Sequence, residues 1–106
     1  MPRSYWMVAI TLENFQTSES LGFKVHGFSV SQRKRVERMQ PEDRLLFYIR
    51  DVQRFGATAT VTSTSFEDRS PIWKSLKDKE VYPFRIHIKP DVVLKDEDLA
   101  DARQIG

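Results

Sequence analysis

The stretch MQPEDRLLFYI, residues 39–49, decides the fold of this chain. Pro41 presets the backbone of a turn, and the acidic side chains of Glu42 and Asp43 can bond to nearby amides. The residues that follow, from Arg44 to Arg50, form an almost unbroken apolar run. A short apolar run that is rich in aromatic and branched residues and bounded by a turn predicts a strand covered on both faces. Such a strand is usually central, so the rest of the chain can be placed against it.

The composition indicates one small domain. A chain of 106 residues holds at most one domain, and its 40% hydrophobic content supplies a modest core. The chain has no cysteine, which excludes a disulfide, a thiolate metal site and a thiol nucleophile. The apolar run near the N-terminus is too short and too polar for a signal peptide or a membrane span. We therefore expect residues 1–106 to form a soluble cytoplasmic domain with no membrane partner.

The net charge of +2 is unevenly distributed along the chain. Residues 24–38 carry five basic side chains and one acidic one, whereas residues 91–101 carry five acidic side chains and one lysine. A basic patch of this kind is typical of a protein that binds a polyanion. On the charges alone, a solvated helix face is the favoured interpretation.

Four strands are predicted, at residues 5–12, 44–50, 57–64 and 81–89. All four are rich in aromatic, branched or small hydroxyl residues, which suit a pleated surface. In the last of them a proline lies near the start, where a strand tolerates it, and apolar side chains then alternate with polar ones. Residues 92–94 extend this strand or begin another.

The main predicted helix runs from Gln32 to Met39. Ser31 is a good N-cap because its hydroxyl can satisfy an orphan amide, and the helix stops before Pro41 because the residue preceding a proline disfavours helical angles. Val36 and Met39, three residues apart, form its inner stripe.

Three shorter helical segments complete the prediction. Residues 16–21 are polar and form a single helical turn. Ser70-Pro71 is a strong helix start, a cap followed by proline, and leads into Ile72, Trp73 and Leu76. Residues 96–103 form a last short helix. The pattern as a whole predicts an α+β fold, with a curved, mainly antiparallel sheet that closes toward a small barrel and helices on its outside.

The sequence contains no pattern that argues for catalysis. It has no Gly-rich phosphate loop, no nucleophile elbow and no zinc-ligand spacing. His26 and His87 are far apart, and the paired acidic residues lie in turns or at helix starts, where capping explains them. We therefore expect a protein that is not an enzyme and that uses no metal or cofactor.

The aromatic residues point more clearly to a function. Most of them belong to the core of so small a domain, but several fall at strand ends next to basic residues. Rings that stack on a base, beside Arg and Lys side chains that hold phosphates, are what base recognition requires. Stacking contributes on the order of 1–3 kcal/mol per base.

Six short motifs, in order, closely resemble the EVE domain, a branch of the PUA-like superfamily that is related to YTH domains. They are Tyr5-Trp6; Glu13-Asn14-Phe15; Gly22-Phe23 with His26-Gly27-Phe28; Arg38 to Arg44 leading into Phe47-Tyr48; Phe66-Glu67-Asp68 with Ile72-Trp73; and Tyr82-Pro83-Phe84-Arg85. The similarity covers nearly the whole chain. One departure is Glu42, because the family has glycine at this turn position.

The resemblance implies a barrel-like, mostly antiparallel sheet with flanking helices. It also implies a pocket for a flipped, modified base, such as methylated or hydroxymethylated cytosine in DNA or a modified base in RNA. EVE domains are readers rather than enzymes. Family members usually continue past residue 106 with a tail that packs on the barrel, so we expect that this chain lacks that segment.

A pocket for a flipped base needs a stacking ring, donors and acceptors for the polar edge, and a niche for the modification. By resemblance it lies between the end of the first strand, the loop around Gly27 and the central strand. The candidate pocket residues are Trp6, Asn14, His26, Gly27, Phe28, Ser29, Tyr48, Phe66 and Trp73. The candidate phosphate-binding residues are Lys24, Arg33, Lys34, Arg35 and Arg38.

Two other functions stay open at this point. Some PUA-like relatives cut RNA, which would need a lysine, a tyrosine and a hydroxyl in one cleft, and Lys24, Tyr48 and Thr62 are the loose candidates. A small-molecule or protein-interaction module with no nucleic-acid partner is the other alternative.

Overall fold

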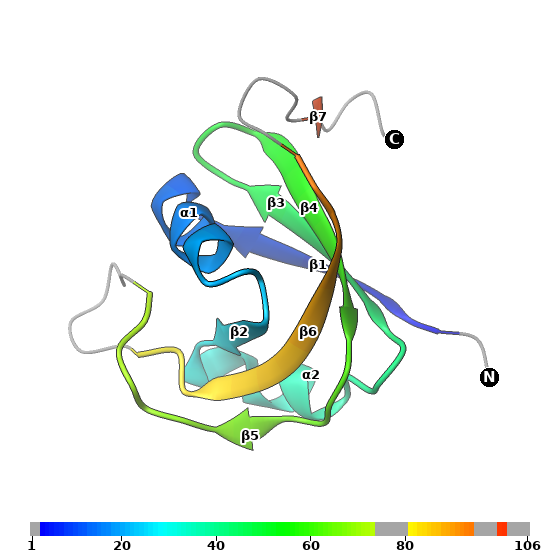
Figure 1. Ribbon diagram of the computed structural model, residues 1–106. Coiled ribbons are helices and arrows are strands. Elements are labelled where there is room, and N and C mark those ends of the chain that lie inside the picture. Colours follow the sequence, from blue (N-terminus) through cyan, green and yellow to red (C-terminus); the bar gives the residue numbers. More distant parts are fainter. Residues whose placement is uncertain (1–2, 74–80, 95–99, 102–106) are drawn as a thin grey trace.

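The computed structural model describes residues 3–73, 81–94 and 100–101, and its strands form one curled sheet (Figure 1). The helical segments are α1 (Leu12–Ser20), the 3₁₀ turn η1 (Val30–Gln32) and α2 (Arg33–Glu37). The spatial order of the strands is β1-β3-β4-β6-β2, with β5 paired to β6 and β7 paired to β4. The strands are β1 (Tyr5–Ile10), β2 (Val25–Phe28), β3 (Arg44–Ile49), β4 (Arg54–Val61), β5 (Phe66–Glu67), β6 (Phe84–Val93) and β7 (Ala100–Asp101).

The curl of the sheet comes from β6, the long curved band in Figure 1. Residues 84–87 of β6 pair with β2, whereas residues 88–93 pair with β4. A register irregularity interrupts the second pairing next to Pro90, which has no amide to donate and is tolerated at a bulge. The strand continues through this bulge to Val93, so residues 92–93 extend it, which is one of the two alternatives that the sequence left open.

The sheet is mixed, because β1 and β3 run parallel. Their register pairs Tyr5 with Arg44 and Ile10 with Ile49, and the other pairings are antiparallel. Strands β1 and β2 are the two ends of the path and do not pair in the described part of the chain. The predicted curved sheet with short helices is therefore confirmed, but as a mixed half-barrel and not as a mainly antiparallel barrel.

Strand β3 begins and ends almost where the sequence predicts, but only one of its faces is buried. Leu45, Phe47 and Ile49 are completely enclosed, whereas the alternate residues are partly exposed. On the outer face Tyr48 packs against Phe55 with ring centroids 5.2 Å apart. The prediction of a strand covered on both faces is therefore wrong, and β4, not β3, is in the middle of the strand order.

The turn before β3 has an unusual backbone at Glu42, the position where Glu replaces the glycine of the EVE motif. Glu42 has φ of +80°, the left-handed region in which glycine carries no steric cost and other residues lose about 1–2 kcal/mol. Its amide donates to Val61 O at 2.8 Å, which ties the turn to the end of β4.

Asp43, the next residue, joins three separate segments. Its carboxylate accepts hydrogen bonds from Ser4 N, Trp6 Nε1 and Gln40 N at 3.0–3.1 Å. Partial burial acts to raise the pKa of Asp43, but these three hydrogen bonds outweigh it and hold the pKa below its ordinary value. The turn that opens β3 thus also anchors the start of β1.

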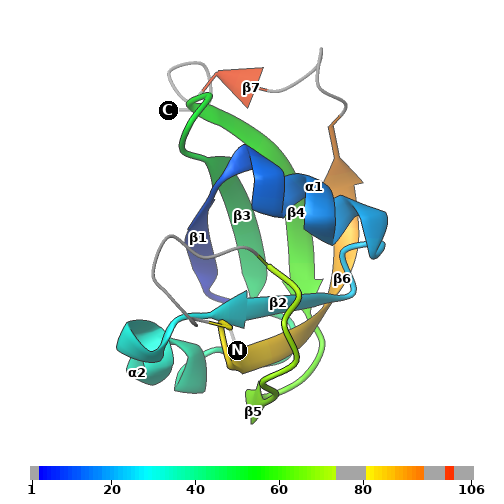
Figure 2. The same cartoon turned by 90° about the vertical axis from the view of Figure 1, so that its left-hand side faces the viewer.

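Helix α1 is longer than the single turn predicted for residues 16–21. Thr11 is its N-cap, and the Thr11 hydroxyl accepts a hydrogen bond from Asn14 N at 3.3 Å. The helix lies across the open side of the curled sheet in Figure 2 and buries Phe15 in the core. The predicted first strand consequently ends at Ile10 instead of residue 12, because Thr11 starts the helix.

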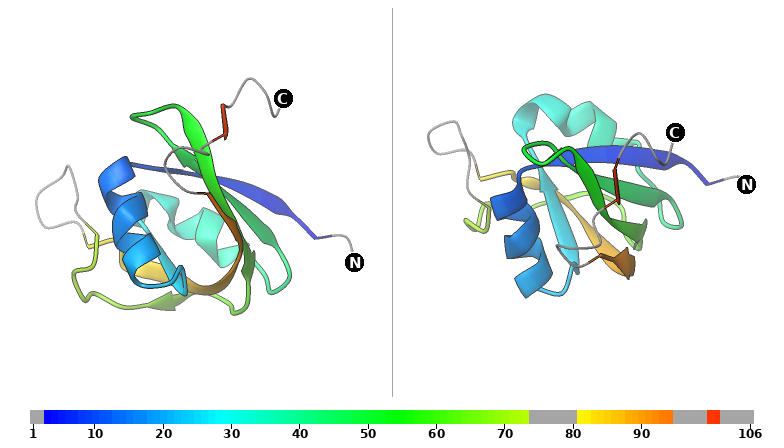
Figure 3. Two further views of the ribbon diagram at one scale, coloured as in Figure 1. Left: turned by 45° about the horizontal axis from the view of Figure 1, so that its top comes forward. Right: turned by 90° about the horizontal axis from the view of Figure 1, so that it is seen from above.

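The other helix predictions need correction. The segment predicted as one helix over residues 32–39 is η1 followed by the short α2, and Ser31 bonds to the Ser29 hydroxyl instead of capping. Val36 and Met39 are buried in the core, as predicted. Seen from above, α1 and α2 lie on different sides of β1 (Figure 3).

Predictions for the C-terminal half are only partly tested. Residues 70–73 are not helical, because Ser70 bonds to Arg85 and Asp68, and residues 74–80 lie outside the described residues. The predicted strand at 57–64 spans residues 54–61. In the last predicted helix, residues 100–101 form β7, and its other residues are outside the described part. None of the described helices is long and apolar enough to cross a membrane.

Candidate ligand pocket

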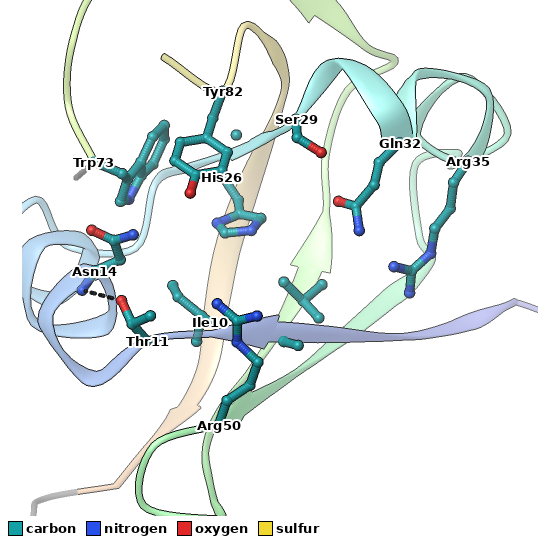
Figure 4. A pocket seen from close by; sticks show the side chains of 13 residues that line it. Ile10, Thr11, Asn14, His26, Ser29, Gln32, Arg35, Arg50, Trp73 and Tyr82 are labelled. Atoms are coloured by element: carbon teal, nitrogen blue, oxygen red, sulfur yellow. Dashed lines mark hydrogen bonds between the residues drawn. The ribbon is translucent and has the colours of Figure 1, made fainter. Parts of the chain in front are cut away.

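A cavity of about 270 Å³ lies in the gap between the two sheet ends, β1 and β2 (Figure 4). A cavity of about 150 Å³ is enough to hold benzene, so this one has room for a single heteroaromatic ring with a substituent. Its lining residues are Val8, Ala9, Ile10, Thr11, Asn14, His26, Gly27, Ser29, Gln32, Arg35, Arg50, Trp73 and Tyr82.

Two aromatic rings form one wall of the cavity. Trp73 and Tyr82 meet edge to face, with ring centroids 6.5 Å apart. Trp73 Nε1 donates to the buried Ser18 hydroxyl of α1 at 2.8 Å, which fixes the orientation of the indole. Gly27 passes directly behind this wall, and a Cβ there would lie 2.6 Å from both Trp73 Cζ3 and Tyr82 O. Only glycine therefore allows the wall to stand this close to β2.

Arg85 holds the backbone that carries this wall. Its guanidinium is 1% exposed and donates to the carbonyl oxygens of Ser70, Val81 and Tyr82. It also lies 5.2 Å from the centre of the Trp73 ring. Tyr82 has φ of +53°, a conformation that costs on the order of 1–3 kcal/mol and that the Arg85 hydrogen bonds help to maintain.

Asp68 is the acidic partner of Arg85 at the surface, with an Oδ2–Nη1 distance of 3.4 Å. Hydrogen bonds from Ser70 lower the pKa of Asp68, and the bond from the Ser70 backbone amide has the largest effect. Burial lowers the pKa of Arg85, and Asp68 opposes this effect. The charged Arg85 side chain therefore connects β6 to the backbone that carries Trp73 and Tyr82.

His26 lies on the floor of the cavity and is 5% exposed. Three aromatic rings meet it edge to face: Phe28 at 4.8 Å, Phe47 at 5.1 Å and Trp73 at 5.7 Å between centroids. Burial, reinforced by the positive charge of Arg35, lowers the pKa of His26 to about 3. Its Nδ1 is enclosed and has no hydrogen-bond partner within the described part of the chain.

Polar and charged side chains surround the rest of the cavity. Asn14 comes from the first turn of α1, and Ser29 and Gln32 come from the segment after β2. Arg35 and Arg50 point toward the cavity from different sides in Figure 4. The Arg35 guanidinium also donates to Met7 O on β1. The site combines a rigid aromatic wall, a neutral polar floor and a cationic rim.

Six of the predicted site residues meet at this cavity. They are Asn14, His26, Gly27, Ser29 and Trp73 from the predicted base pocket and Arg35 from the predicted phosphate set. The cavity lies between the end of β1, the segment around Gly27 and the end of β3, near the place that the resemblance implies, and its role as a base pocket stays a prediction.

Four predicted pocket residues do not line the cavity, because each has another role. Trp6 donates to Asp43 at 3.0 Å and lies under the Arg35 and Arg38 guanidinium groups. Phe28 is core. Tyr48 is on the outer sheet face, and Phe66 stacks on the exposed His87 ring at 4.6 Å.

Four of the predicted phosphate-binding residues also lie away from the cavity lining: Lys24, Arg33, Lys34 and Arg38. Arg33 forms an ion pair with Glu37 at 2.8 Å, within α2, and lies over the Phe84 ring. A role for these side chains along a longer ligand stays a prediction.

The sequence interpretation missed Val8, Ala9, Ile10, Thr11, Gln32, Arg50 and Tyr82. Thr11 and Arg50 follow the last residues of β1 and β3, and the ends of parallel strands lie at the same sheet edge. Recognising that pairing as parallel would have placed both residues together. Tyr82 is the first residue of the Tyr82-Pro83-Phe84-Arg85 motif, which is the signal that could have found it.

Comparison with known proteins gives one relative in sequence. No protein-family model matches the chain. A UPF0310 protein of Pyrococcus abyssi (strain GE5 / Orsay) is 27% identical over 95 residues. The match covers 82% of this chain and 66% of the relative, so the chain spans somewhat less than two thirds of that protein.

Solved structures with the same fold include YTH domains. A YTH domain-containing protein, mmi1, in complex with RNA superposes with a TM-score of 0.65 at 15% identity, over 95% of this chain and 61% of that one. The YTH domain of the Zygosaccharomyces rouxii MRB1 protein, in complex with N6-methyladenosine RNA, gives 0.63 at 21% identity, over 86% and 59%. The expected relationship to YTH domains is confirmed at the level of the fold.

Proposed function

We propose that this chain, which has the fold of YTH domains, is an EVE-type reader of a flipped, modified base in a nucleic acid. The observation that carries the proposal is the cavity between β1 and β2, with its Trp73–Tyr82 wall and cationic rim. Several solved proteins of the same fold are in complex with RNA or with N6-methyladenosine, which supports a nucleic-acid ligand.

The chemistry of the cavity suits a base more than a saturated ligand. A flipped base stacks on the indole of Trp73, which the hydrogen bond to Ser18 already holds in place. Stacking of this kind contributes about 1–3 kcal/mol, and no ordering of the ring is needed on binding. Arg35 and Arg50 at the rim provide charges for the phosphates that flank the flipped nucleotide.

The alternative of an RNA-cleaving enzyme gains no support from the cavity. The three loose candidates for such a mechanism were Lys24, Tyr48 and Thr62, and none of these three residues lines it. Tyr48 packs on Phe55 at the outer face, and Thr62 N donates to His87 O at the end of β4. A reader has no need of a general base, so the proposed function does not depend on them.

Fluorescence anisotropy with short RNA and DNA probes tests this proposal. The probes carry one adenine or cytosine, unmodified or methylated, and are titrated over a range of salt concentrations. We expect one modified probe to bind at least tenfold more tightly than its unmodified partner. With two phosphate contacts on a single strand, log affinity falls against log salt with a slope of about −1.4.

Two variants locate the binding site. Trp73→Ala removes the wall and should abolish the preference, whereas Phe66→Ala removes a ring that stacks outside the cavity and should leave it unchanged. Thermal melting of both variants controls for loss of folding. Binding that is independent of both modification and salt would instead support the small-ligand or protein-interaction alternative.

A further inference from the structure

We propose that His26 selects the base by accepting a hydrogen bond from an exocyclic amino group, so that the cavity takes amino-bearing bases of the adenine or cytosine type and rejects keto-bearing bases at that edge. This inference rests on the proposed function, because it concerns the ligand of the same cavity. Beyond the proposed function, it assigns a hydrogen-bonding role to His26 and names the bases that the cavity should exclude, those with a keto group at the same edge.

Aromatic rings surround His26, so its side chain can make a polar contact only on the side of the cavity. Rings of Phe28, Phe47 and Trp73 enclose the imidazole at 4.8–5.7 Å between centroids. A buried nitrogen without a partner is costly, and such groups in native proteins call for an explanation. Nδ1 of His26 is such a nitrogen in the described part of the chain, and the enclosing rings are its surroundings. Nε2 is not enclosed in this way, and His26 lines the cavity, so Nε2 is the nitrogen that a ligand can reach. Packing alone would be served better by phenylalanine.

Electrostatics decides which nitrogen keeps the proton. A neutral imidazole has one N–H and one lone pair. Arg35 and Arg50 line the cavity side, and cations there favour a lone pair that faces them. Aromatic faces carry negative charge and favour an N–H that faces them. Both effects place the proton on Nδ1, inside the aromatic enclosure, and leave the Nε2 lone pair for the cavity.

The charge state supports this assignment. Burial and the positive charge of Arg35 lower the pKa of His26 to about 3, so the ring stays neutral and its lone pair stays available at physiological pH. The group opposite Nε2 must then be a donor. An amino group donates, and it still donates after one methylation, whereas a dimethylated amine has no N–H and a keto oxygen presents lone pairs.

The test uses RNA probes that differ at one central base: adenine, N6-methyladenine, N6,N6-dimethyladenine and hypoxanthine, with cytosine and uracil as a second pair. The wild-type chain should bind the better amino-bearing probe at least tenfold more tightly than the matching keto probe. The dimethylated probe should lose the same factor relative to the monomethylated one.

His26→Phe should bring the amino and keto probes to within about twofold of each other while its melting temperature stays equal or rises. His26→Gln, whose side-chain carbonyl can accept a hydrogen bond, should keep part of the preference. His87→Phe is the matched control, because His87 is exposed on β6 and outside the cavity lining, and it should behave as wild type.

Three results would overturn the inference while leaving a base reader in place: equal binding of amino and keto probes by the wild-type chain, a preference for the keto probes, or an unchanged preference in His26→Phe. A large fall in the melting temperature of His26→Phe would also count against it, because it would mean that the nitrogen stabilises the fold. Absence of binding to every probe would overturn the proposed function and this inference together.

Discussion

Acid should destabilise this protein through His26, over a pH range in which the other groups with shifted pKa values among the described residues do not titrate. The pKa of His26 is about 3 in the folded chain and 6.5 when the ring is free in water. Between these two values the unfolded chain binds a proton that the folded chain does not. The contribution of neutral His26 is therefore complete above pH 6.5 and is lost as the pH falls toward 3.

The size of this effect follows from the two pKa values. A pH of 5 is about 1.5 units below the pKa of the unfolded ring, so that ring is protonated while the folded ring is still neutral. This difference corresponds to a loss of about 2 kcal/mol in the free energy of unfolding. Asp43 and Asp68 also have pKa values below the ordinary 3.8. The stability that these two carboxylates contribute is present above pH 3.8 and is lost only below it, outside the range from pH 8 to pH 5.

The assay is urea unfolding at pH 8, 6.5 and 5 and constant ionic strength. The wild-type chain should lose about 2 kcal/mol more between pH 8 and pH 5 than His26→Phe, which has no ring nitrogen to protonate. His87→Phe, the matched control, should keep the wild-type loss. An equal loss in wild type and His26→Phe would refute the reasoning, since it would mean that the folded chain accommodates the charged ring.

Three further substitutions test the packing around the cavity and the turn before β3. Gly27→Ala forces a Cβ to within 2.6 Å of the Trp73 ring, so we expect a loss of about 1–3 kcal/mol in urea unfolding together with a shift of tryptophan emission; wild-type values for both would contradict the packing. Asp43→Asn exchanges one acceptor oxygen of the carboxylate for an amide and should cost about 1–3 kcal/mol, with the Trp6 indole signal in an NMR spectrum as a local readout. Arg85→Met leaves three carbonyl oxygens without their donor and should cost about 3 kcal/mol and weaken ligand binding, and unaltered near-ultraviolet circular dichroism would speak against its role.

Local sequence signals were sufficient for the frame of the fold. The turn at Glu42 and the apolar run behind it placed β3 almost to the residue, because proline, acidic side chains and a short run of bulky apolar residues act over short distances. Val36 and Met39 were correctly assigned to the core by their helical spacing.

The features that local sequence signals did not predict depend on contacts between distant segments. The parallel pairing of β1 with β3 has no local signature, so the meeting of Thr11 and Arg50 at one sheet edge was not foreseen. Trp6 is a pocket candidate by resemblance, but its indole donates to Asp43, a partner far along the chain, and it does not line the cavity. Tyr82 belongs to the Tyr82-Pro83-Phe84-Arg85 motif, but no local signal marks it as a ring of the site.

The position of the cavity between the two ends of the sheet also bears on how the chain folds. The β3–β4 hairpin joins neighbours in sequence and can form early, whereas β1 must find β3 and β2 must find β6 across long intervening segments. Non-local pairings of this kind slow folding, because the entropy of closing the loop is lost before any contact compensates for it. The cavity is lined by residues of both β1 and β2, so it is complete only after both of these pairings have formed. A ligand that enters it binds only the finished fold and should shift the folding equilibrium toward that state by mass action, so a cell could hold more of the intact domain when its ligand is abundant.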